Sequence, residues 1–560
     1  MESLPRDQWL LPTIVAYRAQ QTPTKTYIIL PKGDRLEDGF YELSYAEFAR
    51  AVDRMAWWLD ENLGRSAASE GPLELPTVPY IGLDDFRYHL AAIKTRRKAL
   101  LPFPANTPAS IVNLLKTTSS TVVLATASHM RIWEEPLKQY TATAVEVPNL
   151  DHFLSDEPVE HYKYVQTLRE CYDEPAYVIQ TSGTTGQAKT INNTNGFLAD
   201  YIFAPALESR NAQSKDKEAV YGTLEGLMCP ILLPLSWAAA LFAACYSPFC
   251  IDQIPILLPH ATAQMPPTPQ YIVDVTANLP ESAIRKKGIM LTPDILRQLL
   301  RDAKGRECLS RFAMVSYAGA PLDHQTGDAI TDMGVRVQSF IGSTDIGIYP
   351  IRLSDPSDWK VHRFVPGYHG FEMEHFVDDL YELVVKKQGN DPRYGFLINS
   401  GMDVFRTRDL WRQVCGREGY WTNAGRVDDF IKLASMTKFN AITIEQIIEA
   451  DPRVAKCIVA GDARARPFVL VQPKVSCGGV DALSEVLPAV EAANKSLLPE
   501  AHFKKDLVLI TAPDKPILVT AKGTASRRAT LDMYEQEISA LYAKAGFETI
   551  PFKANGETLP

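Results

Sequence analysis

Several features that mark other protein classes are missing from this sequence of 560 residues. Its eight cysteines are scattered without a CxxC pair, so neither a zinc site nor a disulfide framework is expected, and a reducing, cytoplasmic location fits best. No basic run of the kind that follows a nucleic-acid backbone is visible, and 67 acidic against 58 basic residues give a net charge of -9, which argues against a nucleic-acid partner. Because the N-terminus has no apolar stretch of signal-peptide length, we do not expect secretion.

Only one segment is apolar over a length that approaches a membrane span. Residues 226–249, GLMCPILLPLSWAAALFAACYSPF, contain three prolines and have no basic flank. Proline suits a helix interior poorly, and flanking Lys and Arg normally set the orientation of a membrane helix. We therefore expect a strand followed by a buried core helix here, and no membrane partner.

The length and the hydrophobic pattern predict a multidomain α/β protein. A chain of 560 residues is too long for one compact core. Short β-branched runs alternate with helix-length segments, which favours layered α/β subdomains with mainly parallel sheets. The strands are expected at residues 121–129, 176–182, 311–319 and 380–387, and an amphipathic helix at residues 292–303.

The pattern changes near Asp428. Beyond this residue the sequence predicts a compact α+β unit, with a helix at 443–451, strands at 456–462 and 468–473, and a second helix from residue 481. We expect an N-terminal core of residues 1–427, a small mobile C-terminal lid of residues 428–545, and a linker at 546–560, after which the natural chain continues.

The stretch YVIQTSGTTGQAKT, residues 177–190, begins as a buried strand and ends as a polar loop. Its small residues allow backbone amides to converge on an anion, and its hydroxyls and Lys189 add hydrogen-bond donors. A P-loop, GxxxxGK[ST], does not fit, because Ala188 stands where the second glycine belongs. Taken alone, the stretch leaves open a different phosphate-binding loop or a polar turn between a strand and a helix.

Four segments that follow this loop occur in the same order as the motifs of a known enzyme family. TSGTTGQAK resembles the phosphate loop of the adenylate-forming enzymes, which include acyl-CoA synthetases, luciferases and nonribosomal peptide synthetase adenylation domains. FIGSTDIG (340–347), FRTRDL (405–410), GRVDDFIK (425–432) and ILVTAKGTASRR (517–528) resemble the family's later motifs. Longer segments at 79–95, 425–448 and 514–534 resemble the adenylation domain of fungal synthetase-like carboxylic acid reductases.

This resemblance implies that ATP converts a small carboxylic acid to an acyl-adenylate and pyrophosphate. It also implies that the acyl group then passes to the phosphopantetheine thiol of an acyl carrier domain, expected beyond residue 560 of the natural chain. A stand-alone acyl-CoA ligase and an inactive nucleotide-binding regulator remain alternatives. The presence of Lys522, Asp409 and Asp428 argues against the regulator.

The resemblance further implies a role for individual residues. Lys522 would contact the acid carboxylate and the α-phosphate as the adenylate forms, and Asp428 would be the hinge between the domains. Asp345, where the family normally has Glu, would bind Mg²⁺. Asp409 would accept hydrogen bonds from the ribose hydroxyls, and Arg426 would reach a phosphate or ribose oxygen. The other expected ATP-binding residues are Thr181, Ser182, Gly183, Thr184, Thr185, Gly186, Lys189, Ser343, Thr344 and Lys438.

The same resemblance implies an acid pocket lined by Trp237, Ser316, Ala318, Phe340, Ile348 and Tyr349. Trp237 occupies the place of the Asp that pairs with the ammonium in amino-acid-activating domains, so an ordinary α-amino acid is disfavoured. The three aromatic side chains would suit an aryl or aryl-keto acid. They would also suit a quaternary ammonium acid such as glycine betaine, held by cation–π contacts. We favour the betaine because Trp stands at the ammonium position, although any of these rings could fill the core.

Overall fold

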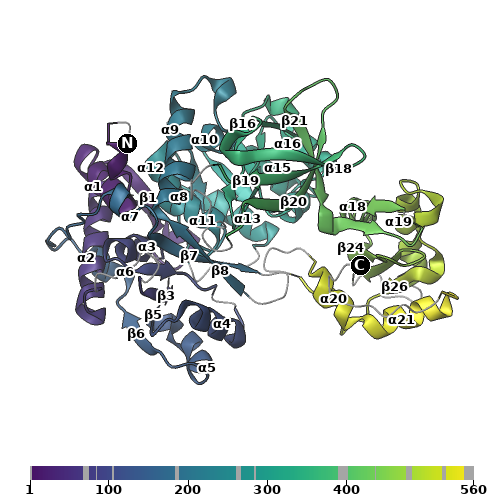
Figure 1. Ribbon diagram of the computed structural model, residues 1–560, viewed down its shortest axis with the longest axis horizontal. Coiled ribbons are helices and arrows are strands. Elements are labelled where there is room, and N and C mark those ends of the chain that lie inside the picture. The colour runs from purple at the N-terminus through teal and green to yellow at the C-terminus, as the bar shows by residue number, and fades with distance from the viewer. Residues whose placement is uncertain are drawn as a thin grey trace.

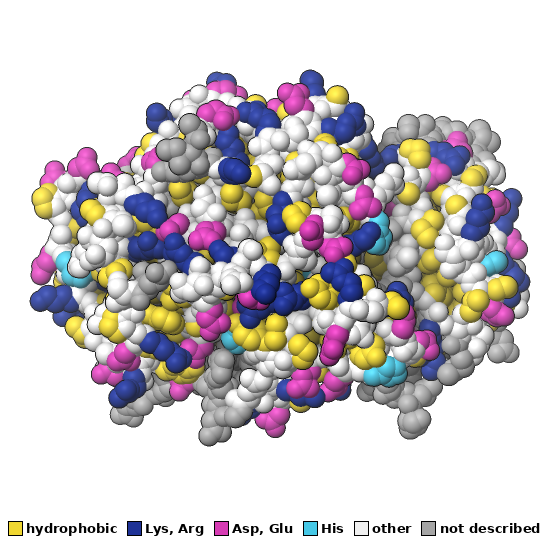
Figure 2. All heavy atoms as spheres, turned by 90° about the horizontal axis from the view of Figure 1, so that it is seen from above, with side chains coloured by type: hydrophobic (Ala, Val, Ile, Leu, Met, Phe, Trp, Pro, Cys, Tyr) yellow, Lys and Arg dark blue, Asp and Glu magenta, His cyan; other side chains and the backbone are white. Residues whose placement is uncertain are grey.

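The computed structural model describes residues 3–66, 75–82, 85–103, 106–182, 188–259, 267–282, 286–388, 401–435, 437–474, 482–519 and 525–547. Figure 1 shows a large N-terminal region, purple to green, and a small C-terminal region in yellow-green at the right-hand end. On the face seen in Figure 2, Lys and Arg side chains are interspersed with acidic ones.

A six-stranded sheet with the order β6-β5-β3-β4-β7-β8 organises the first part of the chain. Its strands are β3 (Thr77–Ile81), β4 (Lys98–Leu100), β5 (Val122–Thr126), β6 (Thr143–Val147), β7 (Pro175–Ser182) and β8 (Ala188–Thr194). All neighbours pair in parallel except β7 and β8, which are antiparallel. The helices of this part are α1 (Leu11–Gln21), α2 (Tyr45–Leu63), α3 (Asp85–Lys94), α4 (Pro108–Thr118), α5 (Glu134–Leu137), α6 (Leu150–Leu154) and α7 (Leu168–Cys171).

Helix α2 shows how the sequence determines this packing. Ser44 and Glu47 form a capping box at its start, which satisfies free backbone N–H groups of the first turn. Phe48, Met55 and Leu59 recur at helical spacing and are buried in the largest hydrophobic core. The amphipathic pattern therefore fixes which face of α2 packs inward.

Two further sheets carry the middle of the chain. One has the order β2-β1-β10-β9 and the other the order β11-β12-β13, and a parallel bridge between Met228 and Lys287 connects β9 to the start of β11. Their strands are β1 (Thr26–Pro31), β2 (Phe40–Ser44), β9 (Met228–Pro230), β10 (Ile254–Ile256), β11 (Gly288–Leu291), β12 (Met314–Tyr317) and β13 (Arg336–Ser339). The helices are α8 (Asn195–Phe197), α9 (Ala204–Asn211), α10 (Ala219–Leu224), α13 (Pro269–Asn278), α14 (Pro293–Leu299), α15 (Ala303–Ser310) and α16 (His324–Asp332).

The apolar segment at 226–249 has the predicted arrangement. Strand β9 is followed by α11 (Ala238–Leu241), the π-helix η6 (Phe242–Tyr246) and α12 (Ser247–Ile251), and most of their side chains are buried. Over the ranges described, every helix is too short or too polar to cross a bilayer.

The prediction of a single helix at 292–303 is wrong at its C-terminal end. Helix α14 stops at Leu299, and α15 starts anew because the Asp302 side chain accepts a hydrogen bond from Gly305 N at 2.8 Å.

The strand expected at 380–387 is present but lies in an antiparallel sheet. This sheet has the order β16-β17-β21-β20-β19-β18 and pairs antiparallel throughout. Its strands are β16 (Ile351–Arg352), β17 (Val361–Phe364), β18 (Phe371–Val377), β19 (Leu380–Lys386), β20 (Val404–Gln413) and β21 (Tyr420–Arg426). Parallel pairing is thus concentrated in the earlier sheets.

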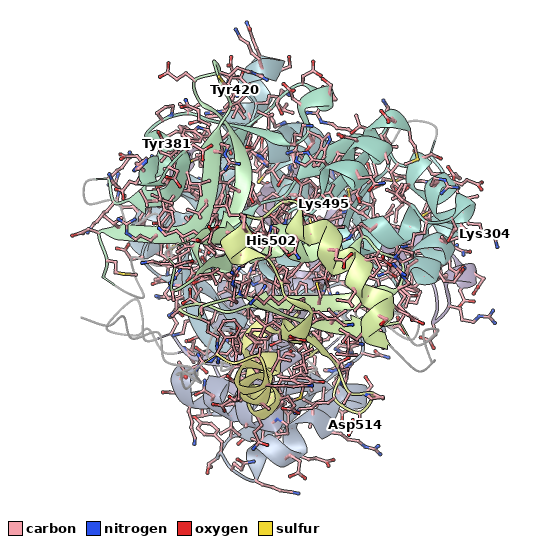
Figure 3. All side chains as sticks on the ribbon, turned by 90° about the vertical axis from the view of Figure 1, so that its right-hand side faces the viewer. Lys304, Tyr381, Tyr420, Lys495, His502 and Asp514 are labelled. Carbon is pink, nitrogen blue, oxygen red and sulfur yellow. The ribbon has the colours of Figure 1, made fainter. Side chains whose placement is uncertain are left out.

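The C-terminal region has its own sheet, β24-β25-β26, and its own hydrophobic cores. Its elements are β22 (Phe430–Lys432), β23 (Lys438–Asn440), α18 (Ala441–Glu449), β24 (Val454–Ala460), β25 (Phe468–Pro473), α19 (Ala482–Asn494), β26 (Val508–Ile510), α20 (Arg527–Met533) and α21 (Glu535–Lys544). Figure 3 looks onto this region, with Lys495, His502 and Asp514 in front and Tyr381 and Tyr420 on the antiparallel sheet. The fold class, a large α/β region with a small α+β region, is confirmed, while the limits at 427 and 545 stay predictions.

Candidate active site

The glycine-rich stretch is flanked by two paired strands. Thr181 pairs with Lys189 and Ser182 with Ala188, in antiparallel register. Gly183, Thr184, Thr185 and Gly186 lie outside the described residues, as do the side chains of Thr181, Ser182 and Lys189. A P-loop leads from a strand into a helix, whereas here the chain returns as strand β8. The topology therefore agrees with the missing glycine at Ala188, and it corrects the alternative of a turn between a strand and a helix.

Asp345 lies in the turn of a small hairpin made of β14 (Gly342–Ser343) and β15 (Gly347–Ile348). The Ser343 hydroxyl donates to Asp345 Oδ2 at 3.0 Å and accepts from Asp345 N at 3.2 Å. Gly347 has a φ of +81°, and a Cβ there would lie 2.6 Å from the Tyr201 ring. Tyr201 also donates to the Ile348 carbonyl, so the hairpin is held closely against this tyrosine.

The surroundings of Asp345 suit a magnesium ion that also binds substrate phosphates. Among the described residues, no group of three or more His, Cys, Asp and Glu side chains could hold a metal ion. Mg²⁺ usually keeps several waters and is bound through one or two carboxylates together with substrate phosphates. The half-buried Asp345 carboxylate, with the half-buried Thr344 beside it, fits such a site.

Asp409 is the centre of a buried polar cluster on β20. Tyr349 donates its hydroxyl to Asp409 Oδ2 at 2.6 Å, and Arg426 Nη1 of the neighbouring strand lies 3.4 Å from Oδ1. Arg426 also donates to the Thr407 carbonyl at 3.3 Å. Burial raises the pKa of Asp409, whereas Arg426 and the bond from Tyr349 lower it. The structure thus brings together Asp409 and Arg426 as expected, and adds Tyr349.

Asp428 lies in the short 3-10 helix η10 (Val427–Asp429), between the antiparallel sheet and the C-terminal region. Its carboxylate pairs with Arg408 at 2.6 Å, and both side chains are about half exposed. Lys438 is exposed on β23. Lys522 lies outside the described residues. On either side of it, Val519 and Ala525 form an isolated antiparallel bridge, and Arg527 at the start of α20 pairs with the buried Glu445 at 2.8 Å.

A cavity with about 420 Å³ of empty space, including the part open to solvent, lies between α11, η6 and the strands β9, β11 and β12. Ser316 and Phe340, both predicted for the acid pocket, line it. The lining residues that sequence reasoning missed include Leu232, Ala239, Ala240, Phe242, Gln253 and Met290. The sequence signal for several of them is the apolar run at 226–249, which by itself predicts only buried core.

The other four predicted pocket residues are not among those that line this cavity. Trp237 lies with its ring centroid 6.2 Å from that of Phe103, and the Ile348 carbonyl accepts from Tyr201. Tyr349 belongs to the Asp409 cluster, and Ala318 follows strand β12. Of the three aromatic residues expected to converge, Phe340 alone lines the cavity.

Two family models define the class of this protein. Residues 15–368 match the family model described as AMP-binding enzyme, and residues 428–546 match that of the AMP-binding enzyme C-terminal domain. The chain therefore belongs to the AMP-binding enzyme family and is an ATP-dependent, adenylate-forming enzyme.

Relatives of known name agree with the resemblance seen in the sequence. A carboxylic acid reductase from Neurospora crassa is 27% identical over 559 residues, covering 97% of this chain and 51% of that protein. An adenylate-forming reductase from Serpula lacrymans is 28% identical, covering 93% of this chain and 49% of that protein. The chain thus spans about half the length of these curated relatives. The predicted closeness to fungal reductases of this kind is confirmed.

Solved structures share the fold. ATP-bound MatB from Rhodopseudomonas palustris superposes with a TM-score of 0.69 at 18% identity, covering 94% of this chain and 99% of that one. The anthranilate CoA ligase AuaEII, in complex with anthranoyl-AMP, superposes with a TM-score of 0.69 at 14% identity, covering 95% and 98%. At such low identity these likenesses support the architecture alone.

Proposed function

We propose that this chain is the adenylation region of a larger carboxylic acid reductase of the fungal synthetase-like type. It would activate a small carboxylic acid with ATP and Mg²⁺ and load the acyl group onto the phosphopantetheine thiol of a carrier domain. One observation carries the proposal. The segment 340–349 supplies Phe340 to the cavity, Asp345 to the hairpin turn and Tyr349 to the Asp409 cluster, which supports adjoining sites for the acid, the metal and the nucleotide.

The chemistry follows from these neighbours. The acid carboxylate attacks the α-phosphorus of ATP, a new P–O bond forms, the bond between the α- and β-phosphates breaks, and pyrophosphate leaves. Positioning and charge neutralisation supply most of the rate in such a transfer. Mg²⁺ held by Asp345 would neutralise phosphate charge when bound. Asp409 would hold the ribose. Phosphate contacts would come from the loop Thr181, Ser182, Gly183, Thr184, Thr185, Gly186 and Lys189, from Ser343, Thr344, Arg426 and Lys438, and from Lys522.

Thiol loading requires the small region to turn about Asp428. The ion pair between Asp428 and Arg408 is half exposed on both sides. Pairs of this kind contribute roughly 0–1 kcal/mol, so it would hold the present arrangement only weakly. A hinge at Asp428 is therefore compatible with its surroundings.

The cavity favours an acid that carries no charge beyond its carboxylate. Among the described residues that line it, none is Asp, Glu, Lys, Arg or His. Its polar side chains already have partners, because Ser316 donates to the Ile289 carbonyl at 3.3 Å and Gln253 accepts from Ser247. A quaternary ammonium ion would need several aromatic faces, and Phe340 and Phe242 are the aromatic rings that line the cavity. We therefore place aryl and other apolar acids ahead of glycine betaine.

A panel of acids scored by ATP–pyrophosphate exchange tests this assignment. Benzoate and phenylpyruvate should each give a kcat/KM at least about 10-fold higher than glycine betaine, because the apolar cavity leaves an ammonium ion desolvated. If exchange is fastest with betaine and is lost in Trp237→Ala, the result would support an aromatic cage for betaine and overturn the proposal of an apolar acid. A stand-alone ligase would be indicated by acyl transfer to free coenzyme A at the rate seen with a carrier domain.

A further inference from the structure

Tyr349 is oriented toward the nucleotide site rather than the acid cavity. Its side chain is buried, with 2% exposure, and its hydroxyl donates to Asp409 Oδ2 at 2.6 Å. Its ring centroid lies 5.6 Å from that of Phe371 at an interplanar angle of 61°, and its backbone N donates to the Ile341 carbonyl at 3.0 Å. Packing and backbone bonding therefore fix the phenol where it meets Asp409.

The two oxygens of Asp409 have different partners. Oδ2 accepts from the neutral Tyr349 phenol, and Oδ1 lies 3.4 Å from Arg426 Nη1. A separation of 2.6 Å is typical of a hydroxyl donating to an ionised carboxylate. Each carboxylate oxygen can accept a second hydrogen bond. Asp409 can thus be held by two protein donors and still accept from two vicinal hydroxyls.

We propose that Tyr349 is a positioning residue for ATP. Its phenol holds the plane of the Asp409 carboxylate so that both oxygens remain available to the 2′- and 3′-hydroxyls of the ribose. Tyr349 then acts on the affinity for ATP and has little influence on which acid is accepted. The inference rests on the proposed role of Asp409 in ribose binding.

Tyr349→Phe tests this directly, because it removes one oxygen and keeps the ring. Loss of a hydrogen bond to a charged group should raise KM for ATP about 10-fold, and KM for the acid should change less than about twofold. Tyr27→Phe is the matched control, since it removes a buried hydroxyl that donates to the Ala244 carbonyl at 2.7 Å. Its KM values should stay at those of the wild type.

Ribose analogues separate positioning from general loss of structure. The wild type should use ATP better than 2′,3′-dideoxy-ATP, and this preference should shrink several-fold in Tyr349→Phe, because the carboxylate is no longer held toward the hydroxyls. An unchanged preference in Tyr349→Phe, or a changed order of acids, would overturn the inference. Asp409→Asn separates the proposed ribose-binding role of Asp409 from the proposed positioning role of Tyr349. If Asp409→Asn leaves KM for ATP unchanged, the ribose role itself fails; if it raises KM while Tyr349→Phe does not, only the role of Tyr349 fails.

Discussion

Lys522→Ala is expected to lower the rate of acyl-adenylate formation at least about 100-fold, as loss of one preorganised donor to developing charge does in other enzymes. The lysine ammonium would contact the acid carboxylate and the α-phosphate together, so its contribution is largest when both are bonded in the transition state. Binding of ATP should change only about twofold, because the other nucleotide contacts remain. Pyrophosphate exchange measures the first quantity, and calorimetric titration with ATP the second.

The control for Lys522→Ala is a variant of a second lysine in the same region. Val519 and Ala525, on either side of the lysine in the chain, form a bridge, and Arg527 at the start of the next helix pairs with Glu445. Lys505→Ala removes an exposed lysine from the same region and should retain the wild-type rate. If Lys522→Ala also keeps more than half of that rate, the lysine has no part in adenylate formation.

Arg527→Ala is expected to destabilise the C-terminal region by up to about 3–5 kcal/mol at pH 8, because the buried Glu445 carboxylate loses the partly exposed arginine that compensates its charge. Arg527 donates to Glu445 Oε2 at 2.9 Å and to the Val459 carbonyl at 2.5 Å, and Glu445 also accepts from Val459 N. The arginine thus joins the start of α20 to α18 and β24. Thermal or urea unfolding of the full chain gives the measurement.

The loss of stability in Arg527→Ala, relative to the wild type, should increase with pH. Burial raises the pKa of Glu445 from 4.5 to about 7, although Arg527 opposes this shift. An acid whose pKa is raised by folding contributes less stability as the pH rises above its unfolded value. Below pH 6 the carboxyl is protonated in both proteins and the deficit is smallest. It grows as the pH rises through 7, because only the wild type can pair the ionised carboxylate.

Three variants make the comparison specific. Arg528→Ala removes the neighbouring arginine, which is half exposed and 3.9 Å from Asp532, and should cost less than about 0.5 kcal/mol. Arg527→Lys keeps a charge, and Arg527→Ala with Glu445→Gln removes the uncompensated one, so both should recover part of the loss. A deficit for Arg527→Ala no larger than that of Arg528→Ala would contradict a structural role for the pair.

Local sequence patterns sufficed for much of the fold. The β-branched runs and helical periodicities located β5, β7, β12, β19 and, in the C-terminal region, α18, β24, β25 and α19, because burial imposes these periods on the residue order. The antiparallel pairing of β19 was not predictable, since a single strand carries the same pattern between parallel or antiparallel neighbours. Strand β8 was not predicted, because its residues, AKTINNT, are mostly polar. The break between α14 and α15 depends on one cap, that of Asp302.

Those residues of the candidate site that lie in a sequence motif could be predicted. The motifs point to Asp345, Asp409 and Arg426, and the last two lie on paired strands. The hydrogen bond of Tyr349 to Asp409 could not be predicted from residue order, because the two residues are 60 positions apart in the chain. The sequence of α11 and η6 predicts a filled core rather than cavity walls, since apolar residues around a cavity and in a packed interior follow the same pattern.

Identifying the products of ATP tests the central claim most directly. The protein is incubated with ATP, Mg²⁺ and an apolar acid from the panel, with hydroxylamine present to capture the activated acyl group. The account predicts equal amounts of AMP, pyrophosphate and acyl hydroxamate, all dependent on the acid and lost in Lys522→Ala. Release of ADP and phosphate, or formation of AMP that is independent of the acid, would contradict adenylate formation by this chain.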